Sequence, residues 1–151
     1  MHRTIRVLIC SSLLFLAVFT AASQDIWDVE FLSQVNRIRT SYGVQEVQFD
    51  SSLKSLAIYY SKICAQHGDI NHDYVTDFDF STKMTELELF GSVTELLARS
   101  DNPRTLISTV LSGFMNSTSH REGLLSPDKT MCGAAITVNN NKAFVAVYLK
   151  N

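Results

Sequence analysis

The sequence has few of the residues that interrupt helices and strands. It contains 2 prolines and 6 glycines among 151 residues, and no segment is rich in either. No internal repeat and no low-complexity block is present. The chain therefore lacks the composition of an interdomain linker, and its length fits one domain that buries its own core.

Clustered positive charge is also scarce. The chain has 13 Lys and Arg against 15 Asp and Glu, and two of the basic residues, Arg3 and Arg6, lie at the N-terminus. Without these two, 11 basic residues face 15 acidic ones, a formal charge of −4. Nucleic acids and anionic membrane surfaces attract clustered Lys and Arg. We therefore expect no nucleic-acid partner.

Only one long apolar run occurs, at the N-terminus. The basic residues His2, Arg3 and Arg6 precede VLICSSLLFLAVFTA, which has no acidic residue and leads into the small residues Ala21, Ala22 and Ser23. This is the pattern of a secretory signal peptide. A membrane anchor is the alternative, but an anchor needs about 20 apolar residues and this run is shorter. We expect cleavage near Gln24, which makes residues 1–23 a signal peptide and residues 24–151 one secreted, extracellular domain without a transmembrane anchor.

Two of the three cysteines remain after that cleavage. Cys10 leaves with the signal peptide, whereas Cys64 and Cys132 stay in the domain. An even number of cysteines in an oxidising compartment favours one disulfide between them. Two free thiols buried as small apolar side chains are the alternative.

Hydrophobic periodicity predicts three helices. One covers residues 25–40, and a second begins at Asp50 or Ser51 as its N-cap. Residues 67–80 are polar and irregular, and a short helix or a turn around Gly91 precedes an apolar segment that ends near Ala98. A third helix, capped by Asp101 or Asn102 with Pro103 at its first position, continues to residue 115.

The C-terminal part changes to a β pattern. CGAAITV and AFVAVYL are runs of β-forming residues, and Asn139, Asn140 and Asn141 join them. Asparagine tolerates positive φ, which a tight hairpin turn requires. Helices followed by an antiparallel pair predict an α+β layered domain.

A polar break follows the third helix. FMNSTSHREGLL passes from apolar periodicity to Asn, Ser and Thr, and then to His120 and Arg121. The segment FMNSTSHREGLLSPDKTMCGAAI resembles the closing motif of the CAP superfamily, the SCP/TAPS domains of cysteine-rich secretory proteins, antigen 5 and pathogenesis-related proteins. It is most similar to the short bacterial version, W-M-N-S-x-x-H-R-x-N-I-L. Phe114 stands at the tryptophan position, and the matching residues are Met115, Asn116, Ser117, His120, Arg121, Thr130 and Gly133.

The opening part of the chain is similar to the same family. VNRIRTSYGVQEVQFDSSLKSLA follows V-N-x-x-R-x-x-x-G and L-x-x-x-A, with matches at Val35, Asn36, Arg39, Gly43, Leu53 and Ala57. His72 falls where the family has its first cleft histidine, although His67 is an alternative by chemistry. TELLA then occupies the position of the family's G-E-N-I-A motif, with Glu95 matching.

The resemblance implies a three-layer α-β-α sandwich with a C-terminal antiparallel hairpin and a cleft that gathers His72, Glu95 and His120. Two imidazoles and a carboxylate can hold a divalent ion such as zinc, with His72 and His120 as metal ligands. Arg39 and Arg121 are interpreted as structural residues paired with carboxylates. Thr94 and Leu96 depart from the Gly and Asn of G-E-N, which makes the role of Glu95 the least supported of the three.

The function implied is a secreted binding or effector module, with a sterol or another lipid as its ligand by analogy, or with an extracellular protein partner. The alternatives are a metal-dependent hydrolase that uses the His/Glu cleft and a module that acts through its surface alone. No catalytic residue is assigned, because the sequence contains no G-x-S-x-G, H-E-x-x-H or P-loop motif. Asn116-Ser117-Thr118 is an N-glycosylation sequon.

We predict that a eukaryotic secretion host releases a polypeptide that begins near Gln24, because small residues follow the apolar core. Intact-mass measurement of the secreted protein, before and after enzymatic deglycosylation, tests both the cleavage and the glycan. Asn116→Gln is the matched control for the glycan mass. Recovery of the uncleaved chain in the membrane fraction would contradict the prediction of a signal peptide.

Overall fold

A computed structural model describes residues 26–101 and 106–151. Phe31–Asn151 forms one compact unit, and residues 26–30 are helical and belong to a separate N-terminal unit. The predicted signal peptide and the predicted cap at Asn102 and Pro103 lie outside the described residues. Within the described ranges, no helix is long and apolar enough to cross a membrane.

The described strands form one sheet in the order β1-β3-β4-β2. Their bounds are Gln48–Phe49 for β1, Thr94–Ser100 for β2, Met131–Asn139 for β3 and Lys142–Lys150 for β4. β1 pairs with β3 in parallel, whereas the β3–β4 and β4–β2 pairs are antiparallel. Asn140 and Asn141 turn the β3–β4 hairpin with φ values of 48° and 60°, which confirms the predicted hairpin.

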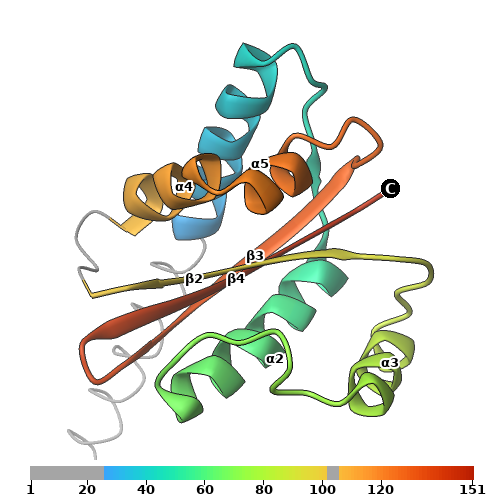
Figure 1. The fold of residues 1–151 in the computed structure, drawn as a ribbon. Helices are drawn as coiled ribbons and strands as arrows, with labels where there is room; N and C mark the ends of the chain where they lie inside the picture. The colour runs from blue at the N-terminus through green and yellow to red at the C-terminus, as the bar shows by residue number, and fades with distance from the viewer. Residues whose placement is uncertain (1–25, 102–105) are drawn as a thin grey trace, which may run out of the picture. The chain divides into compact units, whose positions relative to one another are not determined.

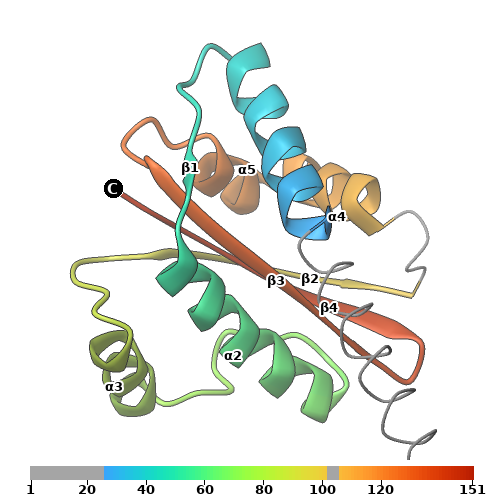
Figure 2. The same ribbon diagram turned by 180° about the vertical axis from the view of Figure 1, so that it is seen from behind.

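Helices cover both faces of this sheet (Figure 1). On one side lie the first helix of the unit, which is helical through residues 31–41, α4 (Leu106–Asn116) and α5 (Thr118–Leu124). On the other side lie α2 (Ser51–His67) and α3 (Asp77–Glu86). The reverse view shows the same arrangement (Figure 2). The predicted three-layer α-β-α sandwich is confirmed.

Strand β4 must be covered by helices on both faces of the sheet. Every residue from 143 to 149 is buried, and a strand covered on both faces carries an unbroken apolar run. Side chains alternate between the faces, so Phe144, Ala146 and Tyr148 join the core beneath α2.

The second predicted helix is confirmed at its cap. The Asp50 Oδ1 atom accepts a hydrogen bond from the Leu53 amide at 2.8 Å, and Gly68 ends α2 with a φ of 73°. The irregular segment predicted for residues 67–80 is wrong from Asp77 onward, where α3 begins. Thr76 caps this helix, because its side chain accepts from the Asp79 amide at 3.1 Å.

The polar break after α4 is much shorter than the sequence indicated. Ser117 alone adopts an extended conformation, with φ −99° and ψ 124°, and α5 begins at Thr118. His120 and Arg121 therefore lie inside a short helix rather than in a loop.

Arg39 joins several segments of the unit from a buried position. Its Nε atom donates to the Gln45 carbonyl at 2.8 Å, and its terminal nitrogens donate to the carbonyls of Leu124, Ser126 and Lys129 at 2.6, 3.2 and 2.9 Å. Burial lowers its pKa. The structural role predicted for Arg39 is confirmed, but its partners are backbone carbonyls and not a carboxylate.

The predicted disulfide between Cys64 and Cys132 is wrong, because both thiols are free and buried. Cys64 belongs to the core beneath α2. Cys132 precedes Gly133, where an added Cβ atom would point at the start of α2, so strand alternation turns Cys132 to the opposite face of the sheet. A disulfide requires Cα atoms within about 7 Å, and the sheet separates these two thiols. Burial also raises the pKa of Cys132 to about 12, which keeps its thiol protonated and unreactive.

Gly133 allows α2 to lie directly on β3. A Cβ atom at Gly133 would come within 2.2 Å of the Lys54 nitrogen and 2.4 Å of the Leu53 carbonyl carbon. We predict that Gly133→Ala destabilises the fold by about 3 kcal/mol, because backbone must move to accommodate a methyl group. Urea denaturation measures this change.

Gly113→Ala is the matched control. Gly113 lies in α4 with no heavy atom within 4 Å of an added Cβ, so alanine is expected to stabilise the protein by up to about 1 kcal/mol. Equal stability of the two variants would contradict the close approach of α2 to β3.

Candidate functional site

Glu95 is placed by the register of the sheet. It lies on β2 directly opposite Tyr148 on β4, and the Tyr148 hydroxyl donates a hydrogen bond to Glu95 Oε2. Tyr148 is fully buried, whereas the Glu95 side chain retains 15% of its exposure. Burial and the negative charge of Glu95 raise the pKa of Tyr148. The phenol therefore stays protonated as a hydrogen-bond donor, and it fixes one oxygen of the carboxylate.

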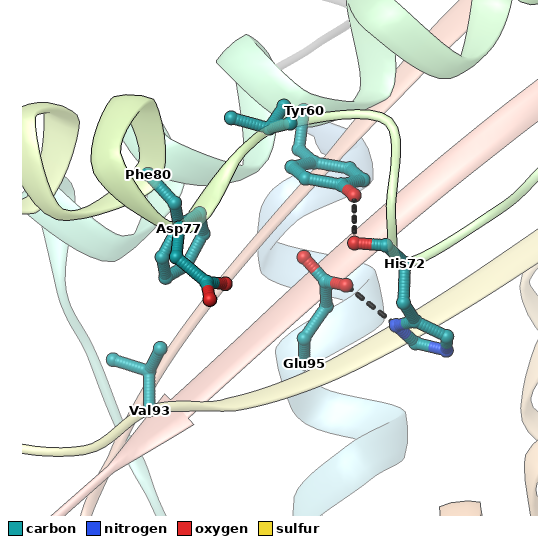
Figure 3. Close-up of a pocket in the computed structure, with 7 residues that line it drawn as sticks. Tyr60, His72, Asp77, Phe80, Val93 and Glu95 are labelled. Carbon is teal, nitrogen blue, oxygen red and sulfur yellow. Dashed lines mark hydrogen bonds and ion pairs between the residues drawn. The ribbon is translucent and has the colours of Figure 1, made fainter.

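His72 holds the other oxygen of Glu95. Its Nδ1 atom lies 2.6 Å from Glu95 Oε1, and its side chain is 56% exposed (Figure 3). An ionised carboxylate only accepts hydrogen bonds, so Nδ1 carries the proton in this pair. The second ring nitrogen, Nε2, is then free to accept or to bind a ligand.

Tyr60 positions the loop that carries His72. From α2, its hydroxyl donates to the backbone carbonyls of Asn71 and His72 at 3.0 and 2.6 Å. Burial and the charge of Glu95 raise the pKa of Tyr60, so this phenol also remains a donor. Two buried tyrosines thus fix the two halves of the His72–Glu95 pair.

A pocket of about 180 Å³ opens beside this pair, between β2, α2 and the segment that leads into α3. Figure 3 shows the carboxylates of Asp77 and Glu95 directed toward the same space. Its lining consists of aromatic, aliphatic and ionisable side chains, namely Tyr60, His72, Val75, Asp77, Phe80, Val93 and Glu95.

His120 is the predicted residue that does not line this pocket. It lies on α5, which packs on the other face of the sheet, where Gly123 approaches Thr94 and Leu96. Its ring lies 5.2 Å from that of Phe114. Burial lowers the pKa of His120, and a positive charge on His72 lowers it further. The two imidazoles therefore interact electrostatically around the edge of the sheet.

The expected zinc site does not fit this arrangement. A zinc site needs three or four protein ligands on one ion. In residues 26–101 and 106–151, no group of three or more His, Cys, Asp or Glu side chains could hold a metal ion. His72 and Glu95 bind each other through Nδ1, and His120 approaches from the opposite layer.

The other residues singled out in the sequence are His67, Asn116 and Arg121. His67, the alternative to His72, stacks on Tyr74 with ring centroids 4.1 Å apart and does not line the pocket. Asn116 is exposed at the end of α4, and its glycosylation stays a prediction. Arg121 donates to the Met115 carbonyl at 3.2 Å, which is a structural contact.

The sequence interpretation missed both tyrosines of the site. Tyr60 lies within the second predicted helix, and Tyr148 lies in the predicted β run AFVAVYL. A buried tyrosine requires a partner for its hydroxyl, and that requirement was the available signal. The identity of the partner depends on the β2–β4 register, which the sequence does not display.

We predict that His120 titrates below the usual histidine value of about 6.5 and that His72→Gln raises its pKa without restoring that value, because burial remains the larger cause. Histidine ring resonances followed against pH by NMR, with a chelator present, measure both. Because the folded-state pKa lies below the unfolded one, stability from neutral His120 is present above about pH 6.5 and is lost as the pH falls through the folded-state pKa.

His67→Gln is the matched control, since His67 does not contribute to the shift of His120. An unchanged His120 titration in His72→Gln would contradict the proximity of the two imidazoles.

The chain matches a known family over most of its length. The sequence profile of the cysteine-rich secretory protein family, CAP, matches residues 32–149. No curated protein matches the chain significantly.

Solved structures share the fold. An outer surface protein from Borrelia burgdorferi is similar with a TM-score of 0.65 at 20% identity, over 80% of this chain and 89% of that one. An extracellular SCP-domain protein from Bacillus anthracis is similar with a TM-score of 0.67 at 20% identity, over 85% of this chain and 41% of that one. The CAP domain of Enterococcal PrgA is similar with a TM-score of 0.63 at 16% identity, over 82% of this chain and 59% of that one. The chain thus spans only about half the length of the last two.

The sequence profile, the three-layer sandwich and the similar structures agree, and the chain belongs to the CAP, or cysteine-rich secretory protein, family.

Proposed function

We propose that this CAP domain is an extracellular binding module and that its ligand occupies the pocket beside His72 and Glu95. The observation that carries the proposal is the fixed carboxylate of Glu95. Both of its oxygens are held, one by Tyr148 and one by His72, at the wall of an open pocket. Removing a carboxylate from water is costly, and an apolar pair at these positions would stabilise the strands without that cost.

The composition of the pocket favours binding over catalysis. None of the seven lining residues is a serine, threonine, cysteine or lysine, the side chains that most often act as nucleophiles. The hydroxyl of Tyr60 is committed to backbone carbonyls. A hydrolase that uses a metal would also need a ligand set that the described residues do not provide.

The extracellular location rests on the N-terminal sequence. Residues 1–23 have the charge, length and small C-terminal residues of a signal peptide. Two similar structures carry names that place those proteins outside the cell, an outer surface protein and an extracellular protein. We extend that location to this chain as part of the proposal.

The volume of the pocket limits the ligand. Pockets that enclose drug-sized molecules measure about 300–1,000 Å³, and this one measures about 180 Å³. The sterol or lipid expected by family analogy would therefore have to lie across the mouth, with only a small group inside. The proposal is a pocket for a small molecule or for the terminal group of a larger one.

We predict that Val93→Phe weakens ligand binding and leaves the fold intact, because the larger side chain fills the pocket without breaking the Tyr148–Glu95–His72 contacts. Saturation-transfer NMR with a library of small neutral, anionic and cationic fragments, together with decanoate and cholesterol sulfate, tests this on the secreted protein. Fragments that bind the natural protein are expected to weaken at least about tenfold, which corresponds to about 1.4 kcal/mol.

Val138→Phe is the matched control, since Val138 is exposed on β3 and does not line the pocket. Binding that survives Val93→Phe, or the absence of any bound fragment, would contradict the proposed function. Thermal unfolding of both variants shows that a loss of binding is not a loss of fold.

A further inference from the structure

We propose that the pocket recognises a small organic ammonium ion, with Glu95 and Asp77 supplying the negative charge and Tyr60 and Phe80 the aromatic walls. This inference rests on the proposed function and names the ligand class of the same site. It follows from the charge, the ring geometry and the size of the pocket.

The charge of the pocket is negative. The carboxylates of Glu95, from β2, and Asp77, from α3, point into one space (Figure 3). No lysine or arginine lines it, and His72 is the only lining group that can carry a positive charge. Asp77 also complements the N-terminus of α3, but in the described part of the chain it takes part in no salt bridge. A cation would therefore meet two carboxylates, and the one on Asp77 has no salt-bridge partner among the described residues.

Aromatic rings border the same space. The rings of Tyr60 and Phe80 lie 6.5 Å apart at an angle of 78°, and Phe80 lies 6.2 Å from Tyr148 behind them. Both residues line the pocket, so aromatic atoms border it on the α2 side, from Tyr60, and on the α3 side, from Phe80. Aromatic surfaces attract cations through the ring quadrupole, and ammonium ions are held in this way in aromatic cages.

The size of the pocket and its ligand chemistry favour an organic cation over a metal ion. A divalent metal requires several oxygen or nitrogen ligands at short range, and the described residues contain no such group. An alkylated ammonium ion spreads its charge over a larger apolar surface, which matches a lining of two aromatic rings, Val75 and Val93. A volume of about 180 Å³ suits a headgroup rather than a long chain.

The test compares choline with 3,3-dimethylbutan-1-ol, which has the same shape and no charge. Two-dimensional NMR of the secreted protein records which amides shift as each compound is added. Choline is expected to give saturable shifts around the pocket, and the neutral compound is expected to bind at least about tenfold more weakly.

Two variants isolate the two recognition elements. Asp77→Asn and Phe80→Leu are each expected to weaken choline binding several-fold, about the effect of one exposed charge or ring. Glu86→Gln and Phe78→Leu are the matched controls on α3, because neither residue lines the pocket, and both are expected to keep the affinity of the natural protein.

The outcomes separate this inference from the proposed function. Ammonium recognition is overturned if the neutral compound binds as tightly as choline. It is also overturned if choline does not bind while other fragments bind the natural protein and not Val93→Phe. In both cases the proposed binding function stands. If no compound binds in the pocket, both fall. If the natural protein co-sediments with phosphatidylcholine vesicles and Asp77→Asn does not, the result would support a lipid headgroup as the cation. Choline binding without co-sedimentation would support a soluble one.

Discussion

The compact unit depends on one buried guanidinium. Arg39 is inaccessible to water, and its hydrogen bonds go to four backbone carbonyls, in the loop before β1, at the last residue of α5 and in the segment between α5 and β3. These segments lack regular partners of their own, and an unpaired buried carbonyl costs free energy comparable to a lost hydrogen bond. Asn36, one turn earlier, donates to and accepts from the backbone of Val47. Two polar side chains of one helix thus fix both chain segments that enter the parallel β1–β3 pair.

Fixed polar contacts also position the candidate site, at the opposite edge of the sheet. β4 aligns Tyr148 with Glu95 on β2, and the two phenols of the site hold a carboxylate and a loop rather than each other. The site therefore combines a rigid wall from the sheet with a loop that carries the exposed His72. A small pocket with one fixed carboxylate is suited to recognition by charge and shape, which is the basis of both proposals.

The sequence allowed much of the fold to be predicted because its signals are local. The Asp50 cap and the Asn140–Asn141 turn each depend on neighbouring residues, and each was confirmed. Features that depend on three-dimensional pairing were missed or wrong. The count of cysteines favoured a disulfide, but the sheet lies between Cys64 and Cys132. The family spacing predicted His72 and Glu95 as partners, whereas Tyr148 became visible only through the strand register, and His120 lies on the other layer.

The central claim is that Glu95, anchored by Tyr148, accepts a hydrogen bond from the Nδ1 proton of His72 and so leaves Nε2 unprotonated. Long-range proton–nitrogen NMR of the histidine rings reports which ring nitrogen of His72 carries the proton. The account predicts that His72 is the Nδ1–H tautomer in the natural protein and loses this preference in Tyr148→Phe. An Nε2–H tautomer of His72 in the natural protein, unchanged in Tyr148→Phe, would contradict the account.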